Sequence, residues 1–255
     1  MNDVNEPVLH GRVAIVTGGG RGVGEALALA LADAGADIAL AGRTEARLEA
    51  VAKEVASRGR RVHVALTDIT DAAAVGRLVE STVQELGRLD ILVNNAGTAH
   101  GGDLATTTDE EWDTVVHTNL RGTFLAMRAA GRHMLGQGSG KVINIASNFA
   151  FKGVPQFASY CASKAGIVAL TKVAAVEWAR YGIQVNALAP GYFITGMNEA
   201  ARADAQLHER ILRQIPARRM GEPSELGRWA VLLASPASDF VSGETIVIDG
   251  GQLAR

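Results

Sequence analysis

Short apolar runs alternate with longer segments of helical periodicity along almost the whole of this 255-residue chain. Such alternation is typical of βαβ units, in which parallel strands are joined through helices. The runs are apolar at nearly every position, as expected for strands covered on both faces. We predict seven strands, at residues 13–17, 37–41, 62–66, 90–94, 141–146, 183–188 and 245–249. The predicted fold class is therefore α/β, with a doubly wound parallel seven-stranded sheet and helices on both of its faces.

The segments of helical periodicity between these strands indicate one continuous domain. They lie at residues 23–34, 45–57, 72–86, 109–136, 157–181, 197–213 and 223–234. Gly182 follows the fifth of them, where a glycine can end a helix. No composition shift, low-complexity tract or repeat divides the chain, so we predict a single domain over residues 1–255. The polar first ten residues, which include Pro7, predict a loose tail over residues 1–10.

Composition argues against several classes of protein. A net charge of −2 gives no basic surface for nucleic acid or an anionic membrane. No apolar segment approaches the ~20 residues that span a bilayer, and the amino terminus lacks the apolar core of a secretion signal. The single cysteine cannot form an internal disulfide, and the six histidines show no metal-ligand spacing. We therefore predict a cytoplasmic protein that binds no metal, nucleic acid or membrane.

The first predicted strand runs into a glycine-rich loop, residues 17–24, and then into a helix. Free N–H groups at a helix N-terminus stabilise a diphosphate, provided that no side chain blocks its approach. Glycines alone could mark only a flexible turn, but this loop follows a strand and opens a helix. That context predicts a Rossmann-type dinucleotide site, although the spacing is Gly18-x-x-x-Gly22-x-Gly24 rather than GxGxxG.

Ser147, Tyr160 and Lys164 form a second cluster of candidate residues. Tyr160 and Lys164 are four residues apart and would share one face of a helix. A nearby ammonium favours the phenolate, so we expect a lowered pKa for Tyr160 and a proton donor usable near neutrality. Ser147 would follow a strand at the sheet edge where α/β proteins bind ligands. Each pattern also occurs by chance, since a serine after a strand is usually a turn or helix cap.

Together, these two clusters resemble the short-chain dehydrogenase/reductase family, whose glycine motif is TGxxxGxG. The segment 94–97, Asn-Asn-Ala-Gly, matches the NNAG motif of the family. Asn119 lies in the long fourth predicted helix, where the family also has an asparagine. The resemblance implies a catalytic tetrad of Asn119, Ser147, Tyr160 and Lys164.

The same resemblance implies a set of cofactor contacts. Asp68 follows the third predicted strand, where the family has an aspartate that contacts adenine. Pro190 and Gly191, with Thr195 beyond them, match the loop that meets the nicotinamide carboxamide. The expected cofactor-binding residues are Gly18, Gly20, Arg21, Gly22, Val23, Gly24, Arg43, Asp68, Ile69, Asn95, Ala96, Gly97, Tyr160, Lys164, Pro190, Gly191, Phe193 and Thr195.

Two arginines favour NADP(H) as the cofactor. A site that prefers NAD has an acidic residue near the end of the second strand, which hydrogen-bonds the ribose 2′-hydroxyl. This chain has Arg43 there instead, and a guanidinium can bind a 2′-phosphate through charged hydrogen bonds. Arg21 lies inside the glycine loop, where NADP-using members of the family resemble this chain in having a basic residue. If both arginines point into solvent, NAD(H) is also possible.

The resemblance implies an enzyme that interconverts a ketone and a secondary alcohol by hydride transfer. Tyr160 would act as general acid/base, Ser147 would hydrogen-bond the carbonyl oxygen, and Lys164 would hold the nicotinamide ribose. Asn119 would bind a water that passes protons to Lys164. On its chemistry alone, Asn119 could equally be a polar group bonded to backbone inside a helix.

The small-molecule carbonyl or alcohol substrate is left open by the sequence. The carboxyl half resembles members that act on sugar acids such as gluconate, and also 3-oxoacyl-carrier-protein reductases. Aromatic side chains that would flank the site, any of which could be ordinary core, are Phe149, Phe151, Phe157, Tyr192 and Phe193. Asn148 stands where the family often has a second serine, and Phe193 where it often has a smaller aliphatic residue.

A non-catalytic NADP(H)-binding regulator or scaffold is the alternative function. Such a protein would not need the intact Asn119, Ser147, Tyr160 and Lys164 set, which therefore favours an enzyme. The resemblance also implies a homotetramer, paired through the long fourth and fifth helices and through the last strand. The short apolar C-terminal segment, residues 245–255, suits such an interface.

Overall fold

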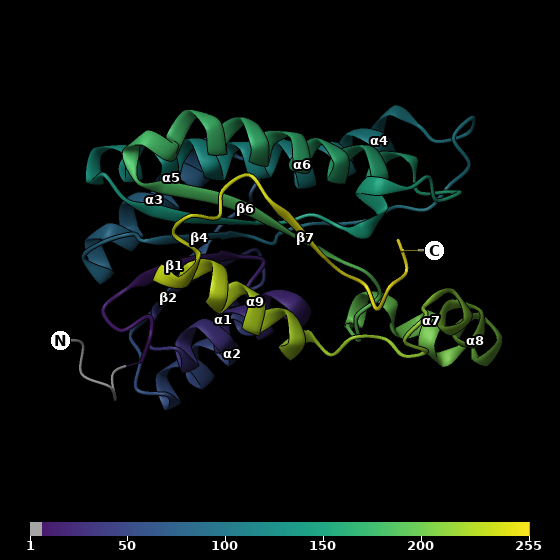
Figure 1. Cartoon of the computed structure of the whole chain (residues 1–255), viewed down its shortest axis with the longest axis horizontal. Helices are drawn as coiled ribbons and strands as arrows, with labels where there is room; N and C mark the ends of the chain where they lie inside the picture. Colours follow the sequence, from purple (N-terminus) through teal and green to yellow (C-terminus); the bar gives the residue numbers. More distant parts are fainter. Residues whose placement is uncertain (1–6, 255) are drawn as a thin grey trace.

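The computed structural model describes residues 7–254, which form one domain around a parallel sheet (Figure 1). The strand order is β3-β2-β1-β4-β5-β6-β7, with every neighbouring pair parallel. The predicted doubly wound, seven-stranded fold is thus confirmed. The strands are β1 (Val13–Thr17), β2 (Asp37–Gly42), β3 (Val62–Leu66), β4 (Ile91–Asn94), β5 (Gly140–Ile145), β6 (Ile183–Pro190) and β7 (Thr245–Ile248).

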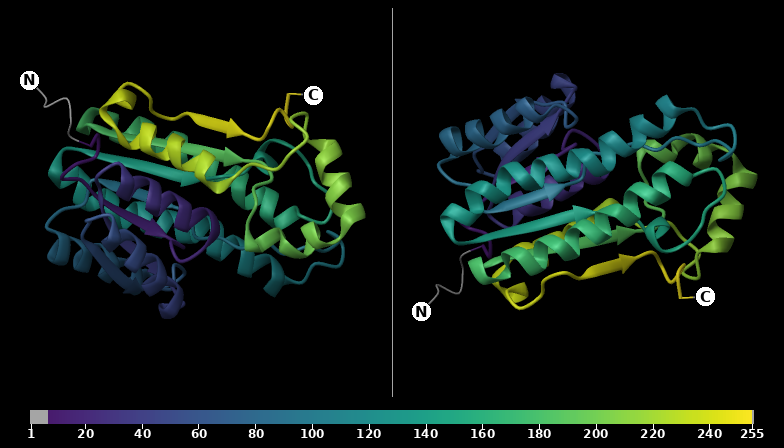
Figure 2. Two further views of the ribbon diagram at one scale, coloured as in Figure 1. Left: turned by 90° about the horizontal axis from the view of Figure 1, so that it is seen from below. Right: turned by 90° about the horizontal axis from the view of Figure 1, so that it is seen from above.

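Helices cover both faces of the sheet, which explains why its central strands are apolar throughout (Figures 1 and 2). One face carries α1 (Gly22–Asp33), α2 (Glu45–Ser57) and α9 (Pro223–Ala234). The other face carries α3 (Ala72–Leu86), α5 (Gly122–Gln137) and α6 (Ala158–Trp178). Each face has its own buried cluster of aliphatic side chains. The sheet therefore lies between two hydrophobic cores. The two ends of its strands are not covered by these helices and remain available for binding sites.

The long helix predicted over residues 109–136 is interrupted in the structure. α4 (Asp109–Val116) runs into a π-helical turn, His117–Arg121, before α5 begins at Gly122. The α4 start is well defined, because Thr108 and Glu111 form a reciprocal capping box. A π-helical turn bulges out of the helix and often marks a functional position. Here it contains Asn119.

The single helix predicted over residues 197–213 is also divided. A 3-10 turn, Gly196–Asn198, leads into α7 (Glu199–Ala203), and α8 (Ala205–Gln214) follows. The break is at Asp204, whose carboxylate accepts hydrogen bonds from the N–H groups of Gln206 and Leu207 at 2.9 and 3.0 Å. This side chain starts a new helix instead of continuing the old one. Both helices lie beyond the carboxyl ends of the strands (Figure 2).

The predicted loose tail over residues 1–10 is only partly described, because residues 1–6 lie outside the described part of the chain. Residues 7–10 differ from the prediction. Leu9 is buried in the core, and its N–H donates a 2.8 Å hydrogen bond to the carbonyl of Ala34. Among residues 7–254, no helix is long and apolar enough to cross a membrane.

Candidate active site

The candidate residues gather at one edge of the sheet, where the strands end. Strand order reverses between β1 and β4, so the loops after these two strands diverge to opposite faces and leave a crevice between them. The loops after β5 and β6 meet at the same edge, and α7 and α8 lie beyond it (Figure 2). This is the edge at which sheets of this type bind ligands.

The glycine loop between β1 and α1 is built around close backbone packing. Gly18 and Gly22 have φ angles of +64° and +57°, which only glycine adopts readily. A Cβ at Gly24 would overlap the carbonyl oxygen of Gly18, so this helix can pack on the loop only through a glycine. Gly20 packs closely against α2, since a Cβ added at Gly20 would lie only 3.2 Å from the Cβ of Arg47.

The N-terminus of α1 is open to a ligand. Arg21 occupies the capping position in an extended conformation, and its side chain makes no capping hydrogen bond. The first N–H groups of α1 and the positive end of its dipole therefore face the crevice. Val23 packs against the core beneath, and Thr195 lies across from Gly22, 3.6 Å from the position of an added Cβ. The predicted diphosphate cradle thus fits this structure.

Thr17, at the end of β1, is a residue that the sequence reasoning missed. Its hydroxyl accepts hydrogen bonds from the N–H groups of Asn95 and Ala96 at 3.0 and 3.1 Å. The Asn95 amide donates in turn to the carbonyls of Thr17 and Gly18, at 3.0 and 3.2 Å. The loop after β4, which includes Gly97, is thereby fixed against the glycine loop.

The cations predicted to bind a 2′-phosphate lie at the β2 side of the crevice. Arg21 and Arg43 are both exposed, and Arg47 of α2 is a third exposed arginine that was not predicted. The pKa of Asp68 is lowered, first by its hydrogen bonds from Thr70 and then by the positive charge of Arg43. Asp68 and Arg43 are therefore near neighbours on this side of the crevice. Ile69 beside them is buried.

Tyr160 and Lys164 lie one turn apart on α6, as predicted. The Lys164 ammonium lies 5.6 Å from the centroid of the Tyr160 ring and donates a 2.6 Å hydrogen bond to the carbonyl of Ile145, at the end of β5. Ser147 lies two residues after Ile145 in the chain and is buried, with only 7% of its surface exposed. Its hydroxyl accepts a 3.2 Å hydrogen bond from the N–H of Phe149. These side chains thus converge at the end of β5.

The electrostatics of this cluster differ from the prediction in one respect. Burial raises the pKa of Tyr160, although an interaction with the Ser147 side chain opposes that rise. Burial also lowers the pKa of Lys164 to about 8. The expected lowering of the Tyr160 pKa by Lys164 is therefore not found in this structure, because both groups are desolvated and the ammonium lies over the ring instead of at the hydroxyl.

Asn119 is completely buried and its side-chain amide is fully engaged. Its oxygen accepts from the N–H of Thr98 at 2.8 Å, while its nitrogen donates to the Thr98 carbonyl at 2.9 Å and to the Ser163 hydroxyl at 3.1 Å. Asn119 thus joins the loop after β4 to α6, the helix of Tyr160. Two roles were predicted for Asn119, binding of a water that passes protons and hydrogen bonding to the backbone. The observed contacts agree with the second role.

The loop after β6 holds the remaining predicted cofactor contacts. Pro190 ends β6, and Gly191 donates a 2.9 Å hydrogen bond to Ile248 of the neighbouring strand. The Phe193 side chain is buried against Gly221, where any side chain would strike its ring. Phe193 therefore serves the core, whereas Thr195 faces the glycine loop.

An aromatic cluster forms one wall beside Tyr160. The Phe149 ring makes edge contacts with Phe157, Tyr160 and Tyr192, at centroid distances of 5.7, 5.9 and 6.1 Å. The Lys152 ammonium lies 5.4 Å from the same ring. Of the five aromatic side chains predicted here, Phe151 is exposed outside this cluster and Phe193 is core.

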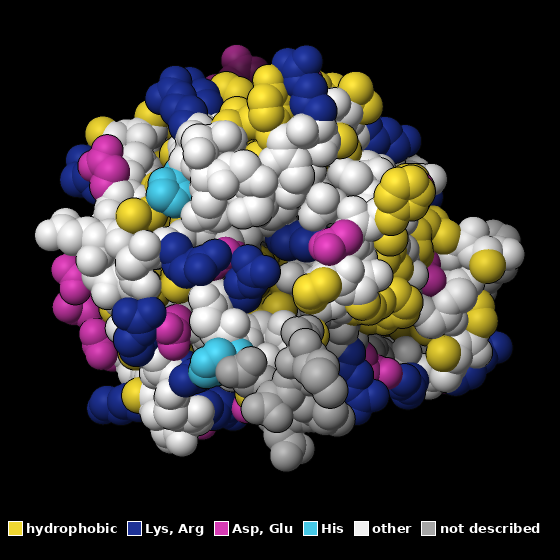
Figure 3. Space-filling view, turned by 60° about the vertical axis from the view of Figure 1, so that its left-hand side comes forward, with side chains coloured by type: hydrophobic (Ala, Val, Ile, Leu, Met, Phe, Trp, Pro, Cys, Tyr) yellow, Lys and Arg dark blue, Asp and Glu magenta, His cyan; other side chains and the backbone are white. Residues whose placement is uncertain are grey.

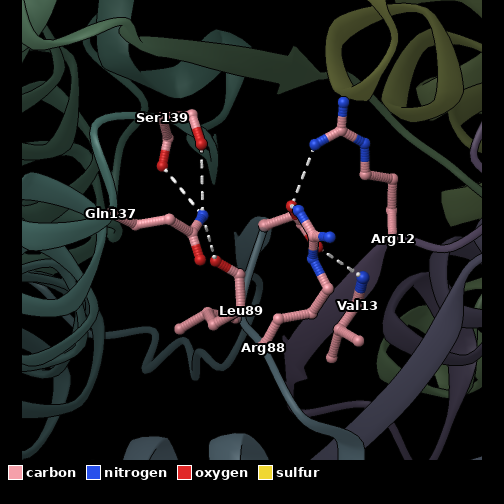
Figure 4. Close-up of polar contacts among 7 residues, drawn as sticks. Arg12, Val13, Arg88, Leu89, Gln137 and Ser139 are labelled. Carbon is pink, nitrogen blue, oxygen red and sulfur yellow. Dashed lines mark hydrogen bonds and ion pairs between the residues drawn. The ribbon is translucent and has the colours of Figure 1, made fainter.

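A hollow of about 290 Å³ lies at the opposite end of the strands, lined by residues such as Arg12, Asp90 and Lys141. Figure 3 brings this end forward and shows Lys and Arg side chains across the middle of the face. Two arginines at this end of the strands, Arg12 and Arg88, share the buried carboxylate of Asp90, with contacts of 2.6–3.0 Å (Figure 4). Asp90 also accepts from the N–H of Val13, so the cluster joins β1 to β4. We assign it a structural role.

Comparison with known proteins agrees with this site. Residues 18–252 match a family model described as enoyl-(acyl carrier protein) reductase. The chain belongs to the short-chain dehydrogenase/reductase family. Members of the family are oxidoreductases that act on CH–OH groups with NAD(P), and this chain is such an enzyme. Within residues 7–254, no group of three or more His, Cys, Asp or Glu side chains could hold a metal ion.

Several family members align over nearly the full chain. The 2-dehydro-3-deoxy-D-gluconate 5-dehydrogenase of Escherichia coli is 43% identical over 97% of both chains. A 3-oxoacyl-(acyl-carrier-protein) reductase of Staphylococcus aureus is 39% identical over 93% of this chain and 96% of its own. The gluconate 5-dehydrogenase of Burkholderia cenocepacia, crystallised with NADP and tartrate, is 39% identical, covers 98% of both chains and superposes with a TM-score of 0.94.

Proposed function

We propose that this protein is an NADP(H)-dependent oxidoreductase that interconverts a ketone and a secondary alcohol, with Tyr160 as general acid/base. The observation that carries the proposal is the meeting of Tyr160, Lys164 and Ser147 at the end of β5, beside the open N-terminus of α1. A binding module would have no need for a phenol and a buried amine at this point. These side chains therefore argue against the alternative, a non-catalytic NADP(H)-binding regulator.

Each side chain has a distinct part in this reaction. The nicotinamide cofactor, when bound, supplies or accepts the hydride. Tyr160 donates its proton to the carbonyl oxygen during reduction, and its raised pKa means that the phenol is protonated at neutral pH. Ser147 hydrogen-bonds the same oxygen as charge develops on it. Lys164, whose ammonium lies over the Tyr160 ring, would hold the nicotinamide ribose, and its pKa of about 8 lets it exchange a proton near neutrality.

The preference for NADP(H) rests on the arginines around the crevice. Arg21, Arg43 and Arg47 are exposed beside the glycine loop, and no carboxylate occupies the end of β2. A 2′-phosphate would be stabilised there by charged hydrogen bonds. The Burkholderia relative was crystallised with NADP, which supports the same assignment.

A sugar acid is the substrate class that the site favours. Lys152 lies over Phe149, and Arg210 is close enough to Tyr192 to oppose the burial that raises the pKa of its phenol. Both cations could hold a carboxylate beside the aromatic wall. The Escherichia coli and Burkholderia relatives are named for sugar-acid substrates. A 3-oxoacyl compound is the second candidate, because a reductase of that class is 39% identical.

The Tyr160→Phe variant tests the mechanism, since it removes only the hydroxyl. The assay for this test is NADPH oxidation with 5-keto-D-gluconate, acetoacetyl-CoA and small diketones as substrates. Loss of general acid catalysis should lower kcat by about 10²- to 10⁴-fold, while NADPH affinity, followed by fluorescence, changes little. Unchanged turnover in this variant would refute the role of Tyr160. NADPH binding without turnover of any ketone in the wild type would favour the regulator.

We further propose that the enzyme acts in the cytoplasm as a homotetramer. The single cysteine, Cys161, suits a reducing compartment, because it leaves no internal disulfide to protect. Two separate groups of exposed apolar side chains suit two kinds of subunit interface.

A further inference from the structure

The C-terminal segment folds back toward the loop that carries Ser147. Immediately after β7, the carboxylate of Asp249 accepts hydrogen bonds at 2.9–3.0 Å from the N–H groups of Gly251, Gln252 and Leu253. An aspartate that bonds the following backbone in this way fixes a tight turn. The turn directs the side chain of Gln252 into the protein, where it is 5% exposed.

Gln252 meets Asn148, the residue next to Ser147. The Asn148 amide donates a 2.6 Å hydrogen bond to the side-chain oxygen of Gln252 and makes a longer, 3.4 Å contact with Asp249. Asn148 is completely buried, and its own oxygen has no partner within the described residues. A buried acceptor without a partner lowers the stability of the folded protein. The hydrogen bond from Asn148 to Gln252 offsets part of that loss. We call Asn148, Asp249 and Gln252 the C-terminal latch.

The latch joins the loops after β5 and β7, and the loop after β6 packs against it. A Cβ at Gly191, just after β6, would lie 2.7 Å from the Cβ of Asp249 and 3.3 Å from the Asn148 amide nitrogen. Only a glycine fits between them. Movement of the latch would therefore displace the loops after β5 and β6 together, and both loops border the candidate site.

We propose that the C-terminal latch positions the Ser147 hydroxyl for the reaction. Asn148 lies between Ser147 and Phe149, whose N–H holds the Ser147 oxygen at 3.2 Å. Fixing the Asn148 side chain fixes the backbone that sets this hydrogen bond. Gln252 and Asp249 are thus positioning residues that act through Asn148 on Ser147. This inference rests on the proposed catalytic part of Ser147.

A double-mutant cycle between Gln252→Leu and Ser147→Ala tests the proposal, with NADPH and the best ketone of the panel. Gln252→Leu should lower kcat by about three- to tenfold, as expected for one lost hydrogen bond, and leave the KM for NADPH unchanged. In the Ser147→Ala background it should have no further effect, because the group that it positions is gone. Equal effects in both backgrounds, or no effect in either, would overturn the latch. The Leu253→Ala variant is the matched control, because it changes the neighbouring side chain and leaves Gln252 in place. It should leave kcat unchanged.

Hydrogen exchange gives a readout that does not require turnover. The peptide that contains Phe149 should exchange faster in Gln252→Leu than in the wild type, while peptides from α2 should not change. Unchanged exchange at Phe149 would overturn the proposal. If Ser147→Ala alone leaves kcat intact, the proposed function of Ser147 fails instead, and the exchange result still decides whether the latch holds this loop.

Discussion

Lys164 is a buried amine, and its burial has a thermodynamic consequence. Its pKa is about 8 in the folded protein, against 10.5 for an ordinary lysine. The unfolded chain therefore binds more protons between these two values, and stability must rise with pH across that window. Below pH 8 the full cost of burying the ammonium is present. Above it, the folded protein releases the proton and the cost is relieved.

We predict that this effect is visible by comparison with Lys164→Met, which has a similar shape and no charge. Between pH 7.5 and 9.5, the free energy of unfolding of the wild type should rise by about 2 kcal/mol more than that of the variant. Urea denaturation at both pH values measures the difference. Parallel pH dependences would contradict the lowered pKa.

Arg43 is expected to discriminate between the two nicotinamide cofactors. Arg43→Ala should lower kcat/KM for NADPH by about 10- to 150-fold, the effect of one charged hydrogen bond, and leave NADH nearly unaffected. Steady-state rates with both cofactors give the result. Arg77→Ala removes an exposed arginine from α3 and should change neither rate. Equal losses for both cofactors in Arg43→Ala would mean that the side chain does not read the 2′-phosphate.

Sequence reasoning predicted residues better than it predicted their electrostatics. Ser147, Tyr160 and Lys164 could be placed together because strand ends and helical spacing fix their positions. The direction of the Tyr160 pKa could not be predicted, because it depends on burial and on whether the ammonium faces the ring or the hydroxyl. Neither quantity is a property of local sequence. Thr17 was missed for a related reason, since its partners are almost 80 residues away.

The glycine loop and α1 act as one element, because Gly24 brings the helix against the loop. We predict that Gly24→Ala lowers the free energy of unfolding by about 1–3 kcal/mol, since the added methyl would overlap the backbone of Gly18 and force the helix away. NADPH affinity should fall with it. Urea denaturation and fluorescence titration measure the two effects.

Gly76, in the middle of α3, is the matched control for that substitution. An added Cβ there would meet nothing within 4 Å. Gly76→Ala should therefore stabilise the protein by up to about 1 kcal/mol through helix propensity alone. If both variants were equally stable, close packing at Gly24 would not be what requires a glycine.

The elements were predictable where hydrophobic periodicity decides them and less so where a single side chain does. All seven strands and most helices follow from apolar patterning. The division at Asp204 depends on one carboxylate that caps α8, which periodicity over residues 197–213 does not reveal. The π-helical turn contains Asn119, whose amide bonds Thr98 and Ser163 in two other segments, and such distant contacts are not visible in the local sequence. Both departures border the candidate site.

At the scale of the whole molecule, two separate surfaces carry exposed apolar side chains. The α5–α6 surface carries the exposed side chains Phe124, Val173 and Val176, the last of them 83% exposed. The α9–β7 surface carries the exposed Trp229 and Leu232 of α9 and the open edge of β7, the final strand in the sheet order. Contiguous exposed apolar side chains mark interaction sites, and an open edge strand can pair with another chain. Two different self-complementary surfaces on one chain generate a tetramer of twofold symmetry.

We predict that the wild type sediments as a tetramer at micromolar concentration and that each surface can be disabled separately. Val176→Glu should give dimers that remain paired through the α9–β7 surface. Leu232→Glu should give dimers paired through the α5–α6 surface, and the double variant should give monomers, because a buried unpaired carboxylate opposes association. Lys53→Glu, on the exposed face of α2, should remain tetrameric. Sedimentation velocity distinguishes these states, and a wild-type monomer, or a tetramer that survives both substitutions, would contradict the assignment of these surfaces as interfaces.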